Sequence, residues 1–218
     1  MALDLLVIAP WVDLATTISA EGALRLANWA RRRGLRVATL FGVNANLLAL
    51  HLTLWVHHSP VVVSFWGHGS PGALHDGLLG FPLIHEGNVR ALRGSRLLYA
   101  MACSSGRRLG PRAAREGVAF IGSVEPLYAF FPEAEHNYAE DWFDMMLAIP
   151  LHVLERYLSR REIDIATLSG ALDAYREKCD AYLALYEEHE GDWPNVDWYI
   201  FALKSNRDAM RLIVPEGL

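Results

Sequence analysis

One histidine and one cysteine of this sequence stand in settings that suit nucleophilic catalysis. His68 lies in a Gly-His-Gly triplet at the end of an apolar run, and Cys103 follows another apolar run within Ala102–Ser104. A thiol becomes a nucleophile when a neighbouring base takes its proton, and histidine is the usual base. The chemistry that this pair can support is attack of a thiolate on a carbonyl carbon.

The glycines around His68 suit the same chemistry. Gly67 and Gly69 allow the backbone to turn sharply and to bring N–H groups close to a substrate carbonyl. We therefore expect the N–H groups of Gly69 and Cys103 to form an oxyanion hole. Taken singly, a cysteine after a strand is usually a small buried residue, and a histidine in a Gly-rich loop is usually polar surface. The catalytic interpretation depends on both occurring at strand ends.

Alternating apolar runs and helical patterns must position these residues. The apolar runs predict five strands, at Leu5–Ala9, Arg36–Leu40, Val61–Trp66, Leu97–Ala102 and Val118–Ile121. Helices are predicted from a cap at Ser19 to about Arg33, over Asn44–Val56 and over Leu109–Glu116. Strands separated by helices indicate a mostly parallel sheet covered on both faces, with His68 and Cys103 at its carboxyl edge. The glycine-rich stretch Gly67–Gly87 is expected to be a long loop or a small hairpin.

The remainder of the chain reads mainly as helix. Helices are expected over Ala134–Ile149 and Leu151–Leu158, with Pro150 as the break, and Ser159–Glu162 is a capping box that could open the next helix. One apolar stripe at helical spacing then marks a long helix: Ile165, Leu168, Leu172, Tyr175, Cys179, Tyr182 and Tyr186. Trp198–Leu203 and Leu212–Val214 are late strand candidates. We therefore divide the chain into an α/β core over 1–126 and a helical extension over 127–218, packed on the same domain.

Charge and composition exclude several classes of protein. The net charge is −5, which argues against binding to nucleic acid. Residues 1–124 hold 12 basic and 6 acidic side chains and residues 125–218 hold 8 and 19, so the two parts should attract each other. Cys103 and Cys179 are the only cysteines, which indicates neither a disulfide framework nor a structural zinc site. The N-terminus has no basic segment before its apolar run and no stretch reads as a membrane span, so we expect a cytoplasmic protein without membrane partners.

The sequence resembles the caspase-like cysteine peptidases, the superfamily that holds caspases, metacaspases, gingipains, separase and the bacterial CHAT-type proteases. Their signature is an apolar block ending in His-Gly and a later one ending in Ala-Cys or Ser-Cys. The matching segments are VVVSFWGHG (Val61–Gly69) and RLLYAMACSSG (Arg96–Gly106). GVAFIGSVEP (Gly117–Pro126) also looks like the strand that follows the nucleophile in CHAT and gingipain relatives.

This resemblance implies a three-layer caspase-like α/β fold and a cysteine endopeptidase. Cys103 would be the nucleophile of a Cys/His dyad and His68 its base and acid, with a thioester intermediate, no cofactor and no metal. The substrate would be a protein or peptide. Because a free cytoplasmic protease is hazardous, a regulatory partner or an activating signal is also expected. By position, the pocket for the substrate side chain would involve Asp13, Met101, Ser123 and Glu125. Relatives that cut after Arg or Lys often carry an acid at the position of Met101, so Asp13 or Glu125 would have to supply it.

Three other interpretations compete with the peptidase. Gly67–Gly72 spells the G-x-G-x-x-G dinucleotide fingerprint, but Gly- and His-rich residues follow it instead of an amphipathic helix. A metal site would draw on the histidines or on an acidic run around His136, although no H-x-x-x-H spacing occurs and the run suits a solvated helix start. These residues are His57, His58, His68, His75 and His85, with Glu133, Glu135, Glu140 and Asp141 in the acidic run.

The third alternative is a catalytically inactive caspase-like scaffold or protein-interaction module. Trp142, Phe143, Met145 and Met146 could form a partner surface, although such a cluster is more often core. An active peptidase and a scaffold differ in one simple respect, because only the peptidase should react at Cys103 with a thiol-reactive peptide probe.

Overall fold

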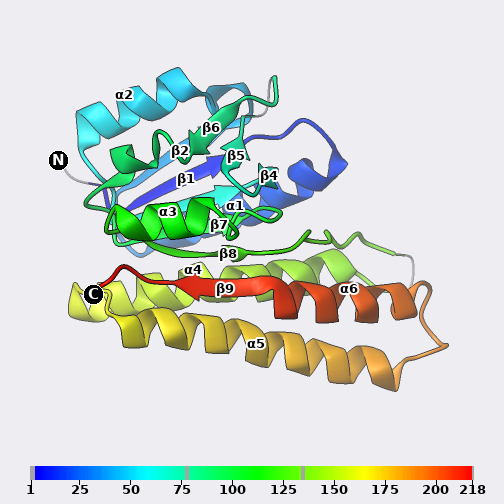
Figure 1. The fold of residues 1–218 in the computed structure, drawn as a ribbon. Coiled ribbons are helices and arrows are strands. Elements are labelled where there is room, and N and C mark those ends of the chain that lie inside the picture. The colour runs from blue at the N-terminus through cyan, green and yellow to red at the C-terminus, as the bar shows by residue number, and fades with distance from the viewer. Residues whose placement is uncertain (1–2, 77–78, 134–135, 218) are drawn as a thin grey trace.

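A six-stranded sheet forms the centre of the computed structural model, which describes residues 3–76, 79–133 and 136–217. The strand order is β2-β1-β3-β7-β8-β9, and every neighbouring pair is parallel except β8 and β9 (Figure 1). The strands are β1 (Leu5–Ala9), β2 (Val37–Phe41), β3 (Val62–Trp66), β7 (Leu97–Met101), β8 (Ala119–Ser123) and β9 (Met210–Ile213). Four of the strands that carry the parallel part are buried along their whole length, which explains why they read as unbroken apolar runs.

Helices cover both faces of the sheet, giving three layers. One face packs against α1 (Leu14–Arg32), α4 (Tyr138–Arg160), α5 (Ile165–Glu188) and α6 (Val196–Ala209) in a single apolar core. The other face packs against α2 (Leu47–His57), α3 (Leu109–Arg115), the short turn η2 (Val89–Leu92) and a small second sheet. A further short turn, η1 (Gly42–Asn44), follows β2. This mixed α/β architecture with a mostly parallel sheet is the fold class that the sequence predicted.

The glycine-rich stretch after β3 forms the small second sheet. Its three antiparallel strands are β4 (Gly69–Ser70), β5 (Ala73–His75) and β6 (Pro82–His85). Because a hairpin follows Gly67–Gly72 where a dinucleotide site requires a helix, the fingerprint interpretation is wrong in its structural context.

Helix α1 begins five positions before the predicted cap at Ser19. Asp13 is the true N-cap: its side chain accepts a hydrogen bond from the backbone N–H of Thr16, and the Thr16 hydroxyl accepts one from the N–H of Asp13. Ser19 lies inside the helix, where its hydroxyl donates to the carbonyl of Ala15. The Asp13–Thr16 capping box therefore defines the entry to the helix, and it places a carboxylate beside the end of β1.

The two helices predicted on either side of Pro150 are one continuous helix, α4. Proline has no N–H, so the carbonyl of Met146, four residues earlier, loses its partner within the helix. The hydroxyl of Tyr99 on β7 donates to that carbonyl at 2.9 Å and satisfies it from outside. Ser159 belongs to the last turn of α4, and Asp164 caps α5, so Ser159–Glu162 does not open a helix. The predicted start at Ala134 lies outside the described residues.

The long apolar stripe is confirmed as α5, and the first late strand is wrong. Trp198–Leu203 lies in α6, where the buried residues recur at helical spacing: Val196, Tyr199, Ala202, Leu203 and Asn206. The run looks like a strand because Trp198 and Phe201 are apolar as well, yet both remain exposed. The second candidate, Leu212–Val214, overlaps β9.

Among the described residues, two ion pairs join the oppositely charged parts of the chain, Arg25 with Glu140 and Arg107 with Glu125. Arg25 on α1 donates two hydrogen bonds to Glu140 on α4, at 2.6 and 2.8 Å. Apolar packing dominates the rest of the contact between α1 and α4. Within the described residues, no helix is both long enough and apolar enough to cross a membrane.

Candidate active site

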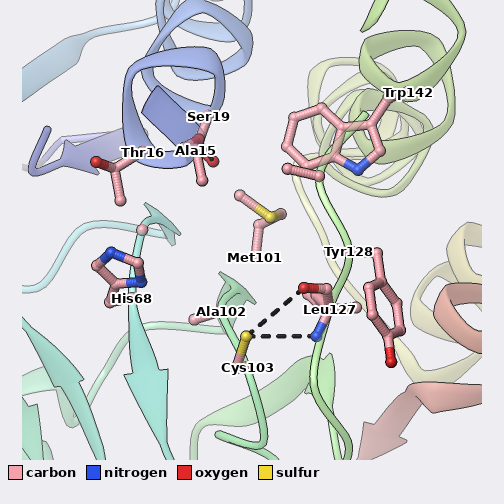
Figure 2. Close-up of a pocket in the computed structure, with 12 residues that line it drawn as sticks. Ala15, Thr16, Ser19, His68, Met101, Ala102, Cys103, Leu127, Tyr128 and Trp142 are labelled. Carbon is pink, nitrogen blue, oxygen red and sulfur yellow. Dashed lines mark hydrogen bonds between the residues drawn. The ribbon is translucent and has the colours of Figure 1, made fainter. Parts of the chain in front are cut away.

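The register of the sheet brings His68 and Cys103 to the same level of its carboxyl edge. Trp66 of β3 pairs with Met101 of β7, and the N–H of Gly67 donates to the carbonyl of Met101 at 3.2 Å. His68 and Cys103 each follow two residues beyond that pair, on neighbouring parallel strands. Both line one cavity of about 100 Å³ (Figure 2). The juxtaposition expected from the strand ends is therefore present in the structure.

Three parts of the chain form the walls of this cavity. The lining residues come from the start of α1, the ends of β3 and β7, and the segment after β8 together with α4. They are Ala15, Thr16, Ser19, Gly67, His68, Met101, Ala102, Cys103, Leu127, Tyr128, Ala129 and Trp142. The contribution of Leu127–Ala129 and Trp142 shows that the helical extension completes the pocket that the α/β core begins.

Asp13 holds the imidazole of His68 from the outside of the cavity. The distance between His68 Nε2 and Asp13 Oδ2 is 2.6 Å, and about half of each side chain is exposed. Burial opposes ionisation of this carboxyl, but the hydrogen bonds from Thr16 and from His68 prevail and lower its pKa to about 2. An ionised carboxylate only accepts, so Nε2 must carry the proton of a neutral His68. Nδ1 is then left with its lone pair, and Figure 2 shows a ring nitrogen on the side facing Cys103.

The pairing of Asp13 with His68 predicts that the stability of the fold depends on pH. Its pKa is lower in the folded chain than the ordinary value of 3.8, so the carboxylate stabilises the fold above about pH 4. That contribution is lost as the pH falls from about 4 toward 2. We expect urea unfolding to show that the stability difference between wild type and Asp13→Asn is larger at pH 5 than at pH 3. A difference that does not change over this range would contradict the pairing.

Cys103 contacts the segment that follows β8. Its Sγ accepts a hydrogen bond from the N–H of Leu127 at 3.3 Å and lies 3.8 Å from the carbonyl oxygen of the same residue (Figure 2). Among the described residues, His68 and Cys103 share no direct hydrogen bond. Catalytic hydrogen bonds are often long without substrate and tighten in the complex. The observation that bears on catalysis is therefore that both residues line one cavity.

The turn after Cys103 adopts a strained backbone. Ser104 is a non-glycine residue with φ +53°, a conformation that costs about 1–3 kcal/mol and that gathers at functional sites. The N–H of Ser104 donates to the carbonyl of Glu125 at 2.9 Å, which holds the turn against the end of β8. Residues 104–108 separate Cys103 from the first turn of α3, so the helix begins further from the thiol than the sequence indicated.

Two backbone N–H groups at this edge of the sheet, those of Cys103 and Gly69, are not used in strand pairing. Cys103 N–H has no hydrogen-bond partner in the described part of the chain. The N–H of His75 donates to the carbonyl of His68, and bonded and non-bonded pairs alternate along an antiparallel ladder. Gly69, which pairs with Leu74, therefore occupies a non-bonded position and its N–H points away from β5. Gly69 also lies against Cys103: a Cβ at this position would be 2.8 Å from the Cys103 carbonyl oxygen.

The remaining predicted pocket residues divide into two groups. Met101 lines the cavity, and Asp13 reaches it through His68. Ser123 and Glu125 do not line it: Ser123 is fully buried and donates to the carbonyl of Glu125, and the carboxylate of Glu125 pairs with Arg107. These two predicted positions lie slightly too early in the sequence, because the segment after β8 lines the cavity only from Leu127 onward.

A buried asparagine fixes the Leu127–Ala129 wall. The N–H of Tyr128 donates to Oδ1 of Asn206 on α6, and Nδ2 of Asn206 donates back to the carbonyl of Tyr128, both at 2.8 Å. Asn206 is 1% exposed. Its amide thus pairs with the backbone of Tyr128 much as a neighbouring strand would.

We expect Asn206→Leu to destabilise the fold, because both backbone groups of Tyr128 would lose their partner. The free energy of unfolding should fall by about 1–3 kcal/mol, measured by urea unfolding. Lys204→Ala is the matched control on the same helix, since its ion pair with Glu187 is half exposed and should change stability by less than about 1 kcal/mol. Equal effects of the two substitutions would show that Asn206 does not fix the wall.

The geometry supports neither a metal site built from the histidines nor a cation site at the acidic run around His136. The part of the chain that the structure describes contains no group of three or more His, Cys, Asp or Glu side chains that could hold a metal ion. His136 instead pairs with Asp141 at 2.5 Å and stacks on Trp193, within a largely buried aromatic cluster. Glu135 lies outside the described residues. Trp142, Phe143, Met145 and Met146 are all buried in the core, so the partner surface suggested for them is wrong.

Comparison with known proteins finds a similar fold in a solved cysteine proteinase. The chain is similar to the Arg-specific cysteine proteinase gingipain R, with a TM-score of 0.58 and 12% identity, over 98% of this chain and 46% of that one. It is also similar to the complex of the RgpB pro- and mature domains of Porphyromonas gingivalis, with a TM-score of 0.55 and 13% identity, over 96% and 46% of the two chains. No family model and no curated protein sequence matches.

The chain therefore has a cysteine-proteinase-like fold and spans about half the length of the solved proteins that it matches. At 12–13% identity these likenesses show the fold alone, and they favour neither a CHAT-type nor a metacaspase relationship.

Proposed function

We propose that this protein is a cysteine endopeptidase in which Cys103 is the nucleophile and His68 its general base and acid. The observation that carries the proposal is that both residues line one cavity at the carboxyl edge of a gingipain-like sheet. Asp13 supports it, because its carboxylate fixes the imidazole with the Nδ1 lone pair available to the thiol. The arrangement then amounts to a Cys-His-Asp relay, although the sequence nominated only the dyad.

The reaction would begin with transfer of the Cys103 proton to Nδ1 of His68. The thiolate attacks the carbonyl carbon of a peptide, and the N–H groups of Gly69 and Cys103 stabilise the resulting oxyanion. The C–N bond breaks as His68 returns the proton to the leaving amine, which leaves a thioester on Cys103. Water, deprotonated by His68, hydrolyses the thioester and releases the carboxylic acid.

The test is to compare alkylation of the two cysteines with hydrolysis of casein at pH 8. Burial raises the pKa of Cys179 to about 12 and hides it completely, whereas Cys103 is partly exposed. We expect iodoacetamide to modify Cys103 alone, as measured by peptide mapping, and hydrolysis to fall in proportion to that modification.

Two outcomes would contradict the proposal. Hydrolysis that persists after complete alkylation of Cys103 would assign the activity to another group. Quantitative alkylation of Cys103 in a chain that cleaves neither casein nor peptides would instead favour the catalytically inactive scaffold.

A further inference from the structure

A second, mostly apolar groove, here called the Trp11 groove, lies at the end of β2. It has a volume of about 520 Å³, and its walls come from the loop after β1, the first turns of α1 and the last residue of β2. The lining residues are Trp11, Thr17, Ala20, Glu21, Leu24 and Phe41. Trp11 and Leu24 are 47% and 40% exposed, so the groove is open to a ligand from solvent.

The strand order places the Trp11 groove on the leaving-group side of the proposed reaction. Along the carboxyl edge of the sheet, Cys103 follows β7 and His68 follows the neighbouring strand β3. The next two strands are β1, which Asp13 follows, and β2, which ends at Phe41. Leu127 lies on the other side of Cys103 from His68 (Figure 2). Because His68 protonates the leaving amine, the leaving half of a peptide passes over His68, toward β1 and β2.

The separation between the two sites fits a short extended peptide. Neighbouring strands lie about 4.8 Å apart, so the three steps from β7 to β2 span about 14 Å. An extended chain rises about 3.4 Å per residue, so the third or fourth residue after the scissile bond reaches the groove. Asp13 marks the path between them: its carboxylate lies 2.6 Å from Nε2 of His68, and Trp11 is two residues before it in the chain.

The indole of Trp11 is held in place although it is half exposed. Its ring centre is 6.0 Å from that of Phe41. The indole also rests on Gly42, where an added Cβ would lie 3.0 Å from it and where φ is +56°, a conformation that favours glycine. An aromatic side chain that is fixed in advance loses little conformational entropy when a ligand packs against it. The groove is therefore suited to receive an apolar side chain.

We propose that the Trp11 groove binds an apolar side chain of the leaving peptide, at the third or fourth residue after the scissile bond. A leucine there buries its side chain against Trp11, Leu24 and Phe41. An acidic side chain gains nothing, because none of the described residues that line the groove is cationic and the carboxylate of Glu21 lies in its wall. This inference rests on the proposed peptidase function and specifies its substrate class.

The test measures how fast peptide fumaramides alkylate Cys103, a reaction that does not require hydrolysis. An electrophilic C=C bond replaces the scissile bond of these probes: the Cys103 sulfur bonds to one alkene carbon, and the thiol proton passes through His68 to the other. The probes carry alanine at every position except the third and fourth after the alkene, which are both Leu, Ala or Asp. We expect the Leu probe to react about 5- to 20-fold faster than the Ala probe, and the Asp probe no faster than the Ala probe. Mass spectrometry of the Cys103 peptide gives each rate.

Two variants show whether the Trp11 groove supplies this preference. Trp11→Ala removes its aromatic wall, and Leu24→Ala shortens an aliphatic one at a helical position that tolerates alanine. Either variant should bring the Leu-to-Ala rate ratio below about twofold. Trp55→Ala is the matched control, because Trp55 is a 79% exposed tryptophan in the last turn of α2, outside the groove lining. Its ratio should equal that of wild type.

The outcomes distinguish this inference from the proposed function. Equal rates for the Leu and Ala probes, or a Leu preference that survives both variants, would overturn the inference and leave the peptidase intact. A Leu preference that both variants abolish, in a chain that hydrolyses neither casein nor peptides, would support the groove and refute the peptidase. If iodoacetamide modifies Cys103 but no fumaramide does, this edge of the sheet does not bind peptides and both proposals fall.

Discussion

Replacing Cys103 with alanine is expected to lower casein hydrolysis by at least about 10⁴-fold, because no other group at the cavity can form the thioester. His68→Ala should lower it to a similar extent, since the thiol would lose its base and the leaving amine its acid. Non-additivity is the more informative result: the double variant should be no slower than either single variant, as for residues that act as one unit. Initial rates over a range of enzyme concentrations give all three values.

Two control substitutions test whether these losses are specific. Cys179→Ala removes the other cysteine, which is buried in the apolar stripe of α5, and should retain activity at a somewhat lower melting temperature. His57→Ala changes a histidine at the end of α2, remote from the cavity lining, and should leave the rate unchanged. If Cys103→Ala kept even a tenth of wild-type activity, Cys103 would not be the nucleophile.

The positions of His68 and Cys103 were predictable because they depend on local patterns. Val62–Trp66 and Leu97–Met101 are apolar on both faces, which is the mark of buried parallel strands, and the residues after such strands meet at one edge. No contact between distant segments had to be known. The oxyanion-hole candidates follow from the same strand ends and remain predictions.

The sequence pattern alone did not identify Asp13 as the hydrogen-bond partner of His68. Asp13 carries two signals at once, since it caps α1 and also pairs with His68. Choosing Ser19 as the cap left Asp13 in a loop and separated it from the imidazole. The Asp-x-x-Thr pattern of Asp13–Thr16 was visible in the sequence as a capping box, and it would have placed the carboxylate beside the end of β1.

The far wall of the cavity could not be predicted from local sequence. Leu127–Ala129 is held by Asn206, which lies on α6 nearly the whole length of the helical extension away. The same limit applies to α4, where Pro150 is tolerated because Tyr99 satisfies the freed carbonyl of Met146. In both cases a side chain from a distant element decides the local structure, and no periodicity records such a pairing.

The second large effect is expected at Gly69, the residue that joins the small second sheet to the active-site edge. A Cβ added there would lie 2.8 Å from the Cβ of Ala102 and 2.8 Å from the carbonyl oxygen of Cys103. Both atoms lie just after the end of β7, and neither the Cβ of Ala102 nor the backbone of Cys103 can move aside without displacing Cys103. Gly69→Ala should therefore displace β4 and with it the Gly69 N–H.

We expect Gly69→Ala to lower kcat by about 10²–10³-fold, the loss typical of removing one oxyanion-hole donor. The free energy of unfolding should fall by about 1–3 kcal/mol, the cost of overpacking. Gly72→Ala is the matched control in the same hairpin, because a Cβ there meets only the flexible ends of Glu86 and Arg108. That variant should keep its activity, so a loss shared by both would indicate a general disturbance of the hairpin. A fully active Gly69→Ala chain would mean that the oxyanion is stabilised elsewhere, because the Gly69 N–H cannot keep its place once the Cβ has forced β4 away from Cys103.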